Sequence, residues 1–328
     1  MAIIKNWLLF IQARFSGINA WYLMAILVLI PTLFAPTWPM QNKVQDTLFV
    51  IDISESMNVP DVETSTGRIA RLELAKRATR EAMASLNCGS KVSLGLFAGD
   101  QVVVLFEPLE VCRHYSSIEQ VVSNITTHMR WIGDSIIENG LINAINESIN
   151  RQLNLVFITD GDEMPHKSAP RVTQLEKLRG KVTGVNFLVG QQVPLPVPRV
   201  DGVGEVVGYW SQEDAAREGY HPNLIALVND LAPGQSAPEN SLNEVEEHMS
   251  AARPEYLKVL STASGLRYEA LKTSHGIALF VASNFLTKQK KADTDIRWMF
   301  AILSTLLVLV GWFSKSGNLL HFIRRRSS

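Results

Sequence analysis

Short apolar runs rich in β-branched residues alternate with segments of helical periodicity between residues 47 and 189. Runs of the first kind that end in polar turns predict buried strands, whereas apolar residues at helical spacing predict helices. Strands that alternate with helices form a mostly parallel sheet covered on both faces. The expected strands are 47–53, 91–98, 101–106, 153–159 and 181–189, and the expected helices are 68–86, 116–125, 136–150 and 172–179.

The strands at 91–98 and 101–106 are separated by two residues only, which predicts a tight hairpin. Extending the pairing outward from its turn brings Cys88 toward Cys112, and the chain contains no other cysteine. A disulfide between them would close the mouth of the hairpin and stabilise the fold by roughly 3 kcal/mol. The alternative is a pair of buried free thiols.

Residues 190–254 interrupt the alternation with seven prolines and a Gly-Val-Gly turn. The segment is too long for an ordinary connection, so we interpret it as a functional insertion or a mobile region. A helix at 255–264 and a strand at 277–282 are expected to complete the domain. The domain is therefore predicted to cover residues 44–285, with the insertion at 190–254.

Two long apolar stretches flank this domain. Residues 21–38 carry no charge, and residues 296–313 carry Arg297 alone. Each stretch is long enough to cross a hydrocarbon core of about 30 Å, and each has aromatic residues at its ends. We therefore expect two transmembrane helices. A cleaved signal peptide is the alternative for the first, but Ala35-Pro36-Thr37 does not form a small-x-small cleavage site.

Six basic residues and no acidic residue lie in the two end segments, 1–20 and 314–328. The positive-inside rule then places both ends in the cytoplasm and residues 40–295 outside, which in a bacterium is the periplasm. Disulfides form and persist there. Between the end segments, 25 basic residues face 32 acidic ones, so the domain has no bulk attraction for nucleic acid. We expect an integral protein of the bacterial cytoplasmic (inner) membrane.

Oxygen-bearing side chains follow two of the expected strands. Asp52, Ser54 and Ser56 stand at the carboxyl end of the first strand, and Asp160 directly follows the strand at 153–159. In an open parallel sheet, ligands collect outside the carboxyl ends of the strands. Carboxylates and hydroxyls are hard ligands of the kind that Mg²⁺ takes, usually together with several waters. These four residues are the predicted metal ligands, for Mg²⁺ or else for Mn²⁺ or Ca²⁺.

Four motifs occur in order: DISES after the first strand, LELAKRA on the next helix, the KVSLGLFAGD hairpin, and LVFITDG. Together they resemble the von Willebrand factor A (vWA) domain family over roughly residues 45–190. The resemblance implies a Rossmann-like α/β fold with a mostly parallel sheet, one antiparallel edge strand and helices on both faces, here flanked by two transmembrane helices. It also implies a metal-ion-dependent adhesion site (MIDAS), in which Asp52, Ser54 and Ser56 match the first motif and Asp160 the distant aspartate.

One position departs from the family pattern. The family commonly supplies a threonine three residues before the glycine of the segment RWIG, where this chain has Arg130. A guanidinium beside the site would oppose a divalent cation by about 4 kcal/mol per pair of unit charges at about 4 Å and an effective dielectric of about 20. Alternatively, Arg130 pairs with Asp52 or Asp160 and leaves the site metal-free, or it points outward and Thr126 or Thr127 takes its place.

A narrower resemblance rests on the segment from Asn87 to Tyr115, on HMRWIGDSI, on PRVDGVGEVVGYW and on the two flanking spans. These features are similar to vWA-type accessory proteins encoded with periplasmic quinoprotein methanol dehydrogenases, which are implicated in maturation of the dehydrogenase and in calcium insertion. Bat-type membrane vWA proteins share the general plan. The resemblance implies a non-catalytic module that binds another periplasmic or membrane protein, with an acidic side chain of that partner completing the coordination of the cation.

Two other functions fit parts of the sequence. A Mg²⁺-dependent phosphoryl-transfer enzyme would use Asp52, but the residue two places on is Ser54 rather than a second acid. The chain also has no P-loop lysine motif, no HExxH and no G-x-S-x-G elbow, so we expect no catalysis. The other alternative is a metal-free structural scaffold of a membrane complex, which Arg130 favours.

Overall fold

The computed structural model of the chain describes residues 20–34, 36–65, 67–164, 170–202, 204–211, 248–283 and 285–326. The chain divides into two compact units, Met1–Asn42 with Lys291–Ser328, and Lys43–Lys290. The expected cytoplasmic segment 1–20 lies outside the described residues except for its last residue. Residues 212–247 of the expected insertion lie outside them as well.

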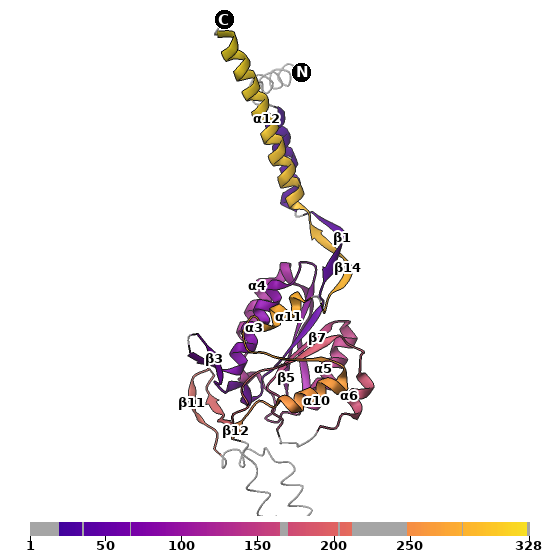
Figure 1. Cartoon of the computed structure of the whole chain (residues 1–328), viewed down its shortest axis with the longest axis vertical. Coiled ribbons are helices and arrows are strands. Elements are labelled where there is room, and N and C mark those ends of the chain that lie inside the picture. Colours follow the sequence, from indigo (N-terminus) through magenta and orange to yellow (C-terminus); the bar gives the residue numbers. More distant parts are fainter. Residues whose placement is uncertain are drawn as a thin grey trace, which may run out of the picture. The chain divides into compact units, whose positions relative to one another are not determined.

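A six-stranded sheet forms the centre of the unit Lys43–Lys290, with strand order β13-β8-β7-β2-β5-β6. The strands are β2 (Thr47–Asp52), β5 (Lys91–Ala98), β6 (Gln101–Glu110), β7 (Asn154–Thr159), β8 (Gly184–Leu188) and β13 (Arg267–Ala270). All neighbours pair in parallel except β5 and β6, which pair antiparallel. The prediction of a mostly parallel sheet with one antiparallel edge strand is confirmed (Figure 1).

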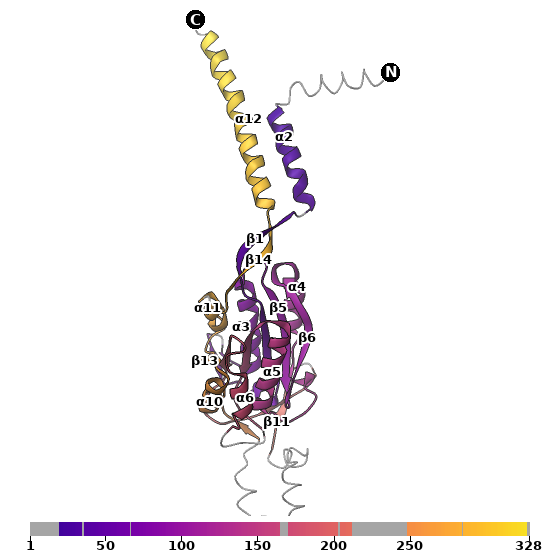
Figure 2. The ribbon, with the colours of Figure 1, turned by 90° about the vertical axis from the view of Figure 1, so that its right-hand side faces the viewer.

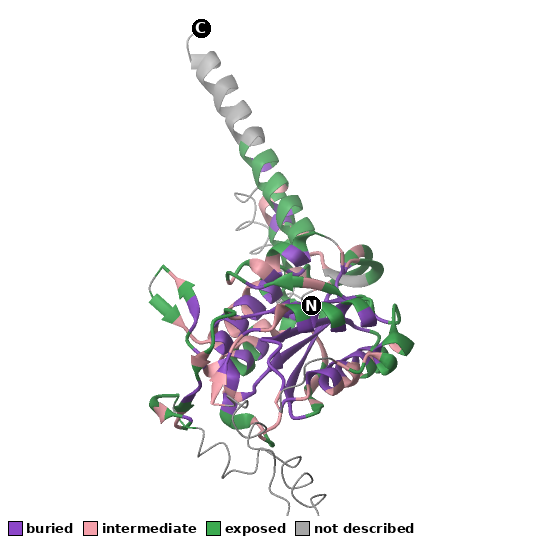
Figure 3. Ribbon diagram, turned by 60° about the horizontal axis from the view of Figure 1, so that its bottom comes forward, coloured by how far each residue is buried: buried purple, intermediate pink, exposed green. Residues whose placement is uncertain are grey.

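Strand β2 is buried along its whole length, as are β7 and β8. Leu48 and Val50 belong to one apolar cluster, and Phe49 and Ile51 belong to another. Successive side chains of a strand point to opposite faces of the sheet, so β2 contributes to a core on each side. This two-sided burial explains why its sequence is continuously apolar rather than alternating, and the buried central strands are visible in Figure 3.

Helices cover both faces of the sheet. The cluster around Phe49 contains residues of α3 (Arg71–Ser85), α4 (Val111–Ser123) and α11 (Gly276–Ala282). The cluster around Leu48 contains residues of α5 (Ile137–Arg151), α6 (Thr173–Leu178) and α10 (Pro254–Ser264) (Figure 2). The expected helical layers on both faces are thus confirmed.

The segment 277–282 is a helix and not the expected strand, so that prediction was wrong. Helix α11 buries Ile277, Phe280 and Val281, which recur at helical spacing. The ring of Phe280 meets that of Phe187 edge-on, with 5.7 Å between the centroids. A short apolar run fits a strand and a buried helix equally well by periodicity. The last strand of the sheet is instead β13, whose polar sequence suits its place at the edge.

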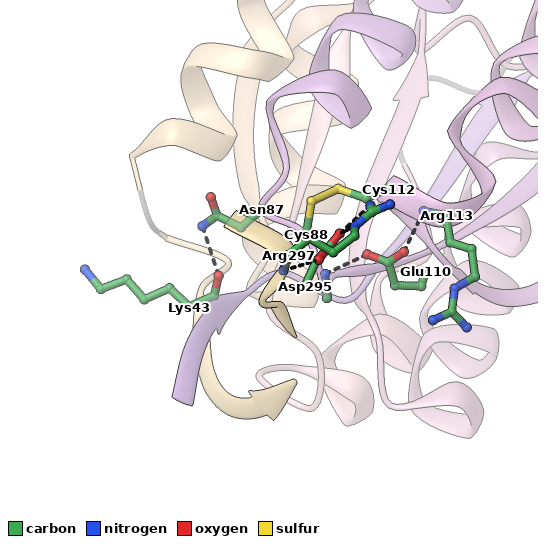
Figure 4. The surroundings of a disulfide bond; sticks show 9 residues. Lys43, Asn87, Cys88, Glu110, Cys112, Arg113, Asp295 and Arg297 are labelled. Atoms are coloured by element: carbon green, nitrogen blue, oxygen red, sulfur yellow. Dashed lines mark hydrogen bonds and ion pairs between the residues drawn. A yellow bond between two sulfur atoms is a disulfide. The ribbon is translucent and has the colours of Figure 1, made fainter. Parts of the chain in front are cut away.

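Cys88 and Cys112 form a disulfide, so the alternative of two free thiols is excluded. The bond lies at the mouth of the β5–β6 hairpin, as predicted, although the strands pair further than expected. Two bulges, each with an extra residue in β6, bring Lys91 opposite Glu110. The Glu110 carboxylate accepts hydrogen bonds from the backbone N–H of Gly89 at 2.7 Å and of Arg113 at 2.6 Å, which ties together the two segments that carry the cysteines (Figure 4).

Cys88, Glu110 and Cys112 also bring three potential metal-ligand atoms within 4.8 Å of one another. Among the described residues, no other set of three cysteine, histidine or acidic side chains meets this criterion. Because both sulfur atoms belong to the disulfide, neither is available as the thiolate that binds a metal. These three residues therefore link the two segments at the mouth of the hairpin and do not form a metal site.

The described ends of the expected insertion form two small strand pairs. Strand β9 (Leu195–Pro196) pairs antiparallel with β12 (Met249–Ser250), and β10 (Pro198–Val200) pairs antiparallel with β11 (Val206–Tyr209). The backbone N–H of Ala252 donates to the carbonyl oxygen of Gln191 at 2.7 Å. The segment therefore leaves the domain and returns to it at one place.

The unit of the chain ends contains α2 (Ala20–Leu29), the short 3₁₀ helix η1 (Ile30–Phe34) and α12 (Arg297–Arg326). The hydroxyl of Ser304 in α12 donates to the carbonyl oxygen of Ala25 in α2 at 3.1 Å. Strands β1 (Thr37–Val44) and β14 (Lys288–Asp295) pair with each other. Within the described ranges, no helix combines the length and the apolar character needed to cross a membrane.

Candidate cation site at the carboxyl edge of the sheet

Asp52 and Asp160 lie at the same edge of the sheet. Asp52 is the last residue of β2, and Asp160 directly follows β7. The two strands are parallel neighbours, with Ile51 opposite Ile158, so their carboxyl ends coincide. Both aspartates are fully buried. The structure thus brings together the two acidic residues that the sequence predicts as metal ligands.

The Asp52 carboxylate is held by two short hydrogen bonds. Its Oδ1 accepts from the backbone N–H of Ser54 at 2.9 Å, and its Oδ2 accepts from the hydroxyl of Thr159 at 2.7 Å. Burial, together with the nearby charge of Asp160, raises the pKa of Asp52 from 3.8 to about 7. The two buried carboxylates therefore repel each other when both are ionised. An added positive charge would relieve this repulsion.

Asp160 is paired with a buried arginine that the sequence analysis did not single out. Its Oδ1 accepts from the backbone N–H of Asp162 at 3.0 Å, and its Oδ2 accepts from Nη1 of Arg71 at 2.8 Å. Nε and Nη2 of Arg71 donate to Oδ2 of Asp61 at 2.9 and 2.7 Å, and Nη1 donates to the hydroxyl of Ser250 at 2.7 Å. Arg71, at the start of α3, is fully buried.

A sequence signal for this arginine exists. Arg71 stands three and four residues before Leu74 and Ala75, which both face the core. A charged side chain on the apolar stripe of a helix is rarely buried without a charged partner. Its position therefore indicated a buried ion pair, although it did not identify Asp160 and Asp61 as the partners.

Arg130 does not approach the two aspartates as the sequence analysis considered. Its Nη1 lies 2.6 Å from Oε1 of Glu55, and both side chains are about one-fifth exposed. Of the two threonines considered as substitutes, Thr127 is engaged elsewhere: its hydroxyl accepts from the Asn58 amide nitrogen at 3.0 Å and donates to the Asn58 amide oxygen at 3.1 Å. For Thr126 the substitution stays a prediction. The guanidinium beside Asp160 thus belongs to Arg71.

A small cavity of about 30 Å³ opens beside Ser54 and Ser56, whose hydroxyl oxygens are 3.0 Å apart. Ser135, from the loop between α4 and α5, also lines this cavity. The sequence analysis missed Ser135, although the HMRWIGDSI segment that contains it was singled out. The full lining is Ser54, Glu55, Ser56, Gly133, Ser135, Asp162, Met164, Val197, Trp210, Met249 and Ser250.

The expected insertion forms one wall of this cavity. Val197, Trp210, Met249 and Ser250 come from its two described ends and face the same space as the DISES turn. Ser250 also receives the hydrogen bond from Arg71. The two described ends of the insertion therefore form part of the candidate site.

The residues present fit a divalent cation. Four serines, Ser54, Ser56, Ser135 and Ser250, line a cavity whose volume holds a small ion with one or two waters. Asp52 and Asp160 do not line the cavity, but each accepts a backbone hydrogen bond from a residue that does, Ser54 and Asp162 respectively. Mg²⁺ keeps several of its waters in proteins, so carboxylates set slightly back can hold it through them. Asp162 also lines the cavity, and burial together with the nearby Asp160 raises its pKa to about 7.

Comparison with known proteins agrees with this fold. The family model of the von Willebrand factor type A domain matches residues 47–163. No curated protein matches the chain in sequence.

Solved structures with a similar arrangement include three bacterial proteins. The conserved hypothetical protein BatB of Bacteroides thetaiotaomicron is 16% identical over 73% of this chain and 96% of its own, with a TM-score of 0.48. An aerotolerance-related membrane protein of Bacteroides fragilis is 17% identical over 74% of this chain and 98% of its own, with a TM-score of 0.47. A von Willebrand factor type A protein of Catenulispora acidiphila is 12% identical over 76% of this chain and 44% of its own, with a TM-score of 0.43.

The matched residues run from the first residue of β2 to the residue after Asp162, and so they include both strands that carry the aspartates. The six-stranded, mostly parallel sheet with helices on both faces is the arrangement that the motif resemblance predicts. Over residues 47–163 this chain is similar to the von Willebrand factor type A domain.

Proposed function

We propose that the unit Lys43–Lys290 is a protein-binding module that holds a divalent cation at the carboxyl edge of its sheet. The cation would bind an acidic side chain of another protein. The observation that carries this proposal is the cavity where the hydroxyls of Ser54 and Ser56 meet, with the buried Asp52 and Asp160 directly behind its lining.

The surroundings of the cavity favour a protein as the ligand. Ile132 and Tyr209 are exposed, and they directly precede the cavity-lining residues Gly133 and Trp210. Met129 and Trp131 of the same loop are exposed as well. Exposed apolar and aromatic side chains around a polar recess are typical of protein interfaces.

We further propose that this module is anchored in the bacterial cytoplasmic membrane by residues 21–38 and 296–313. Residues 1–20 and the tail 314–328 would lie in the cytoplasm, and the domain at 44–285 in the periplasm. The basic end segments support this orientation. The Cys88–Cys112 disulfide supports it independently, because such bonds persist in oxidising compartments.

The partner we propose is a periplasmic enzyme whose assembly or metal insertion the module assists. The similarity of three motif segments to accessory proteins of quinoprotein methanol dehydrogenases supports a dehydrogenase of that kind. Binding rather than catalysis is the proposed activity.

Partner capture by the full-length chain tests this proposal. The methanol dehydrogenase of the organism that encodes this chain would be titrated onto the immobilised chain with Mg²⁺ or with EDTA. We expect saturable capture that EDTA abolishes and that Asp52→Ala removes, while Arg77→Ala, on the exposed side of α3, leaves it intact. Capture that is unchanged by EDTA and by Asp52→Ala would sink the cation-bridged mechanism.

A metal-free scaffold is the second candidate, and the Arg71–Asp160 pair favours it. The guanidinium already supplies one positive charge to the buried acids. Under this alternative, Asp52→Ala would lower stability but capture would not depend on divalent cations. The EDTA arm of the experiment therefore separates the two candidates.

A further inference from the structure

Ser135 is a buried residue of the cavity lining whose hydroxyl lacks a hydrogen-bond partner among the described residues. The residue is 2% exposed, and its Oγ has no hydrogen-bond partner among the described residues. Ser135 lines the same cavity as Ser54 and Ser56. Buried polar atoms nearly always have partners, because leaving one unpaired is unfavourable. A ligand in the cavity would provide that partner.

The backbone around Ser135 is fixed from two sides. Ser135 and Met164 exchange N–H to carbonyl hydrogen bonds at 2.9 and 2.8 Å. The flanking residues bond the hairpin turn: Gly99 N–H donates to the carbonyl of Asp134 at 2.9 Å, and Ile136 N–H donates to the carbonyl of Gly99 at 2.6 Å. Ser135 is thus held at the cavity wall by a loop that is fixed between the β5–β6 turn and the segment after β7.

Gly99 permits this close approach. Its φ is +66°, and a Cβ at this position would lie 2.2 Å from a side-chain carbon of Ile132. The turn between β5 and β6 and the loop that contains Ser135 are therefore in direct contact. Gly99, in the turn of the hairpin, therefore also allows the loop that contains Ile132 to pack against this turn.

We propose that Ser135 supplies the third hydroxyl ligand of the divalent cation, beside Ser54 and Ser56. It would take the role that the family assigns to a threonine, at whose position this chain has Arg130 in an ion pair with Glu55. This inference rests on the proposed function of the cavity as a cation site. It assigns to the cation three neutral oxygen ligands, with Asp52 and Asp160 acting from behind.

Mn²⁺ affinity of the full-length chain and of Ser135→Ala tests the assignment. Changes to groups that support a metal ligand typically weaken binding by about 10- to 100-fold, so we expect Ser135→Ala to raise the Kd by at least about tenfold. Ser148→Ala is the matched control. Ser148 is also buried with an unpartnered hydroxyl among the described residues, but it lies on α5 away from the cavity lining. The Ser148→Ala variant should bind Mn²⁺ with a Kd within about twofold of that of the wild type.

Replacing the Ser135 hydroxyl by a thiol distinguishes a metal ligand from a residue with a purely structural role. Ser135→Cys should bind Mn²⁺ more weakly and the soft cation Cd²⁺ more tightly than wild type, because thiolates prefer soft metals. Ser148→Cys should shift neither affinity. A ratio of Cd²⁺ to Mn²⁺ affinity that Ser135→Cys leaves unchanged would overturn the assignment.

The outcomes also separate this inference from the proposed function. If wild type binds Mn²⁺ and Ser135→Ala binds it equally well, Ser135 is not a ligand but the cation site stands. If wild type shows no saturable Mn²⁺ binding, both the ligand assignment and the cation-dependent function are wrong.

Discussion

Nη1 of Arg71 donates a hydrogen bond to Oδ2 of Asp160 at 2.8 Å, and both side chains are fully buried. The same guanidinium contacts Asp61 and Ser250, so it links the start of α3, the end of β7 and the end of the expected insertion. Asp61 in turn accepts a hydrogen bond from the backbone N–H of Gln191 at 2.8 Å, at the other end of the insertion. One buried charge thus holds both ends of the insertion against the candidate site.

Replacing Arg71 by methionine should destabilise the fold strongly. The substitution leaves Asp61 and Asp160 buried without their cation, and breaking a buried pair in this way typically lowers the free energy of unfolding by about 3–5 kcal/mol. Urea unfolding of the full-length chain measures the effect. Arg77→Ala is the control from the same helix, because the Arg77–Glu73 pair is more than one-third exposed on average and such pairs contribute at most about 1 kcal/mol. Equal losses in the two variants would contradict the assignment.

The stability of the domain should fall as the pH rises from about 4 to about 7. Asp52 and Asp162 have pKa values of about 7 in the folded protein, against 3.8 ordinarily. Between these values the folded state binds protons that the unfolded chain has released, so raising the pH favours unfolding. We expect Asp52→Asn, which cannot titrate, to show a shallower decline than wild type when unfolding is measured across this range. A decline of the same steepness in both proteins would show that Asp52 has its ordinary pKa.

The Cys88–Cys112 bond should contribute about 3 kcal/mol to stability, because it closes a loop with a sequence separation of 24. The double variant Cys88→Ser with Cys112→Ser should melt at a lower temperature than the oxidised wild type. Under a reducing agent, wild type and the double variant should melt together. If the melting temperature of the wild type is the same with and without the reducing agent, the disulfide does not stabilise the hairpin.

Arg130 and Glu55 should tune the cation affinity in opposite directions. Glu55 lines the cavity and is paired with Arg130 at 2.6 Å. Arg130→Gln removes the positive charge that faces Glu55 near the cation, so we expect Mn²⁺ to bind about 3- to 10-fold more tightly, in keeping with a partly exposed charge pair. Glu55→Gln should weaken binding by a similar factor, and the double variant should return close to wild type. Identical affinities in all four proteins would place the cation away from this pair.

The sequence predicted the central strands well because their burial on both sides leaves a continuous apolar pattern. Strands β2, β5 and β7 begin and end within about a residue of the expected positions. The short apolar run of α11 was misread because its length and composition fit a strand as well as a helix. The two bulges leave no mark in the sequence pattern of β6, so the sequence did not predict that this strand continues from residue 106 to Glu110.

The candidate site was predictable in part. The positions of Asp52 and Asp160 follow from the rule that parallel strands end at one edge. Arg71, by contrast, contacts Asp160 and Ser250 across sequence separations of 89 and 179 residues. Ser135 enters the cavity through the conformation of its loop, which tertiary hydrogen bonds to Gly99 and Met164 determine. Neither contact has a counterpart in local sequence pattern.

The most direct measurement is a calorimetric titration of Mg²⁺, Mn²⁺ and Ca²⁺ into the full-length chain, beside Asp52→Asn. Our account predicts saturable binding of at least one of these cations by wild type, and its loss when the buried Asp52 charge is removed. Absence of binding by wild type, or equal binding by both proteins, would contradict a cation site at the carboxyl edge of this sheet.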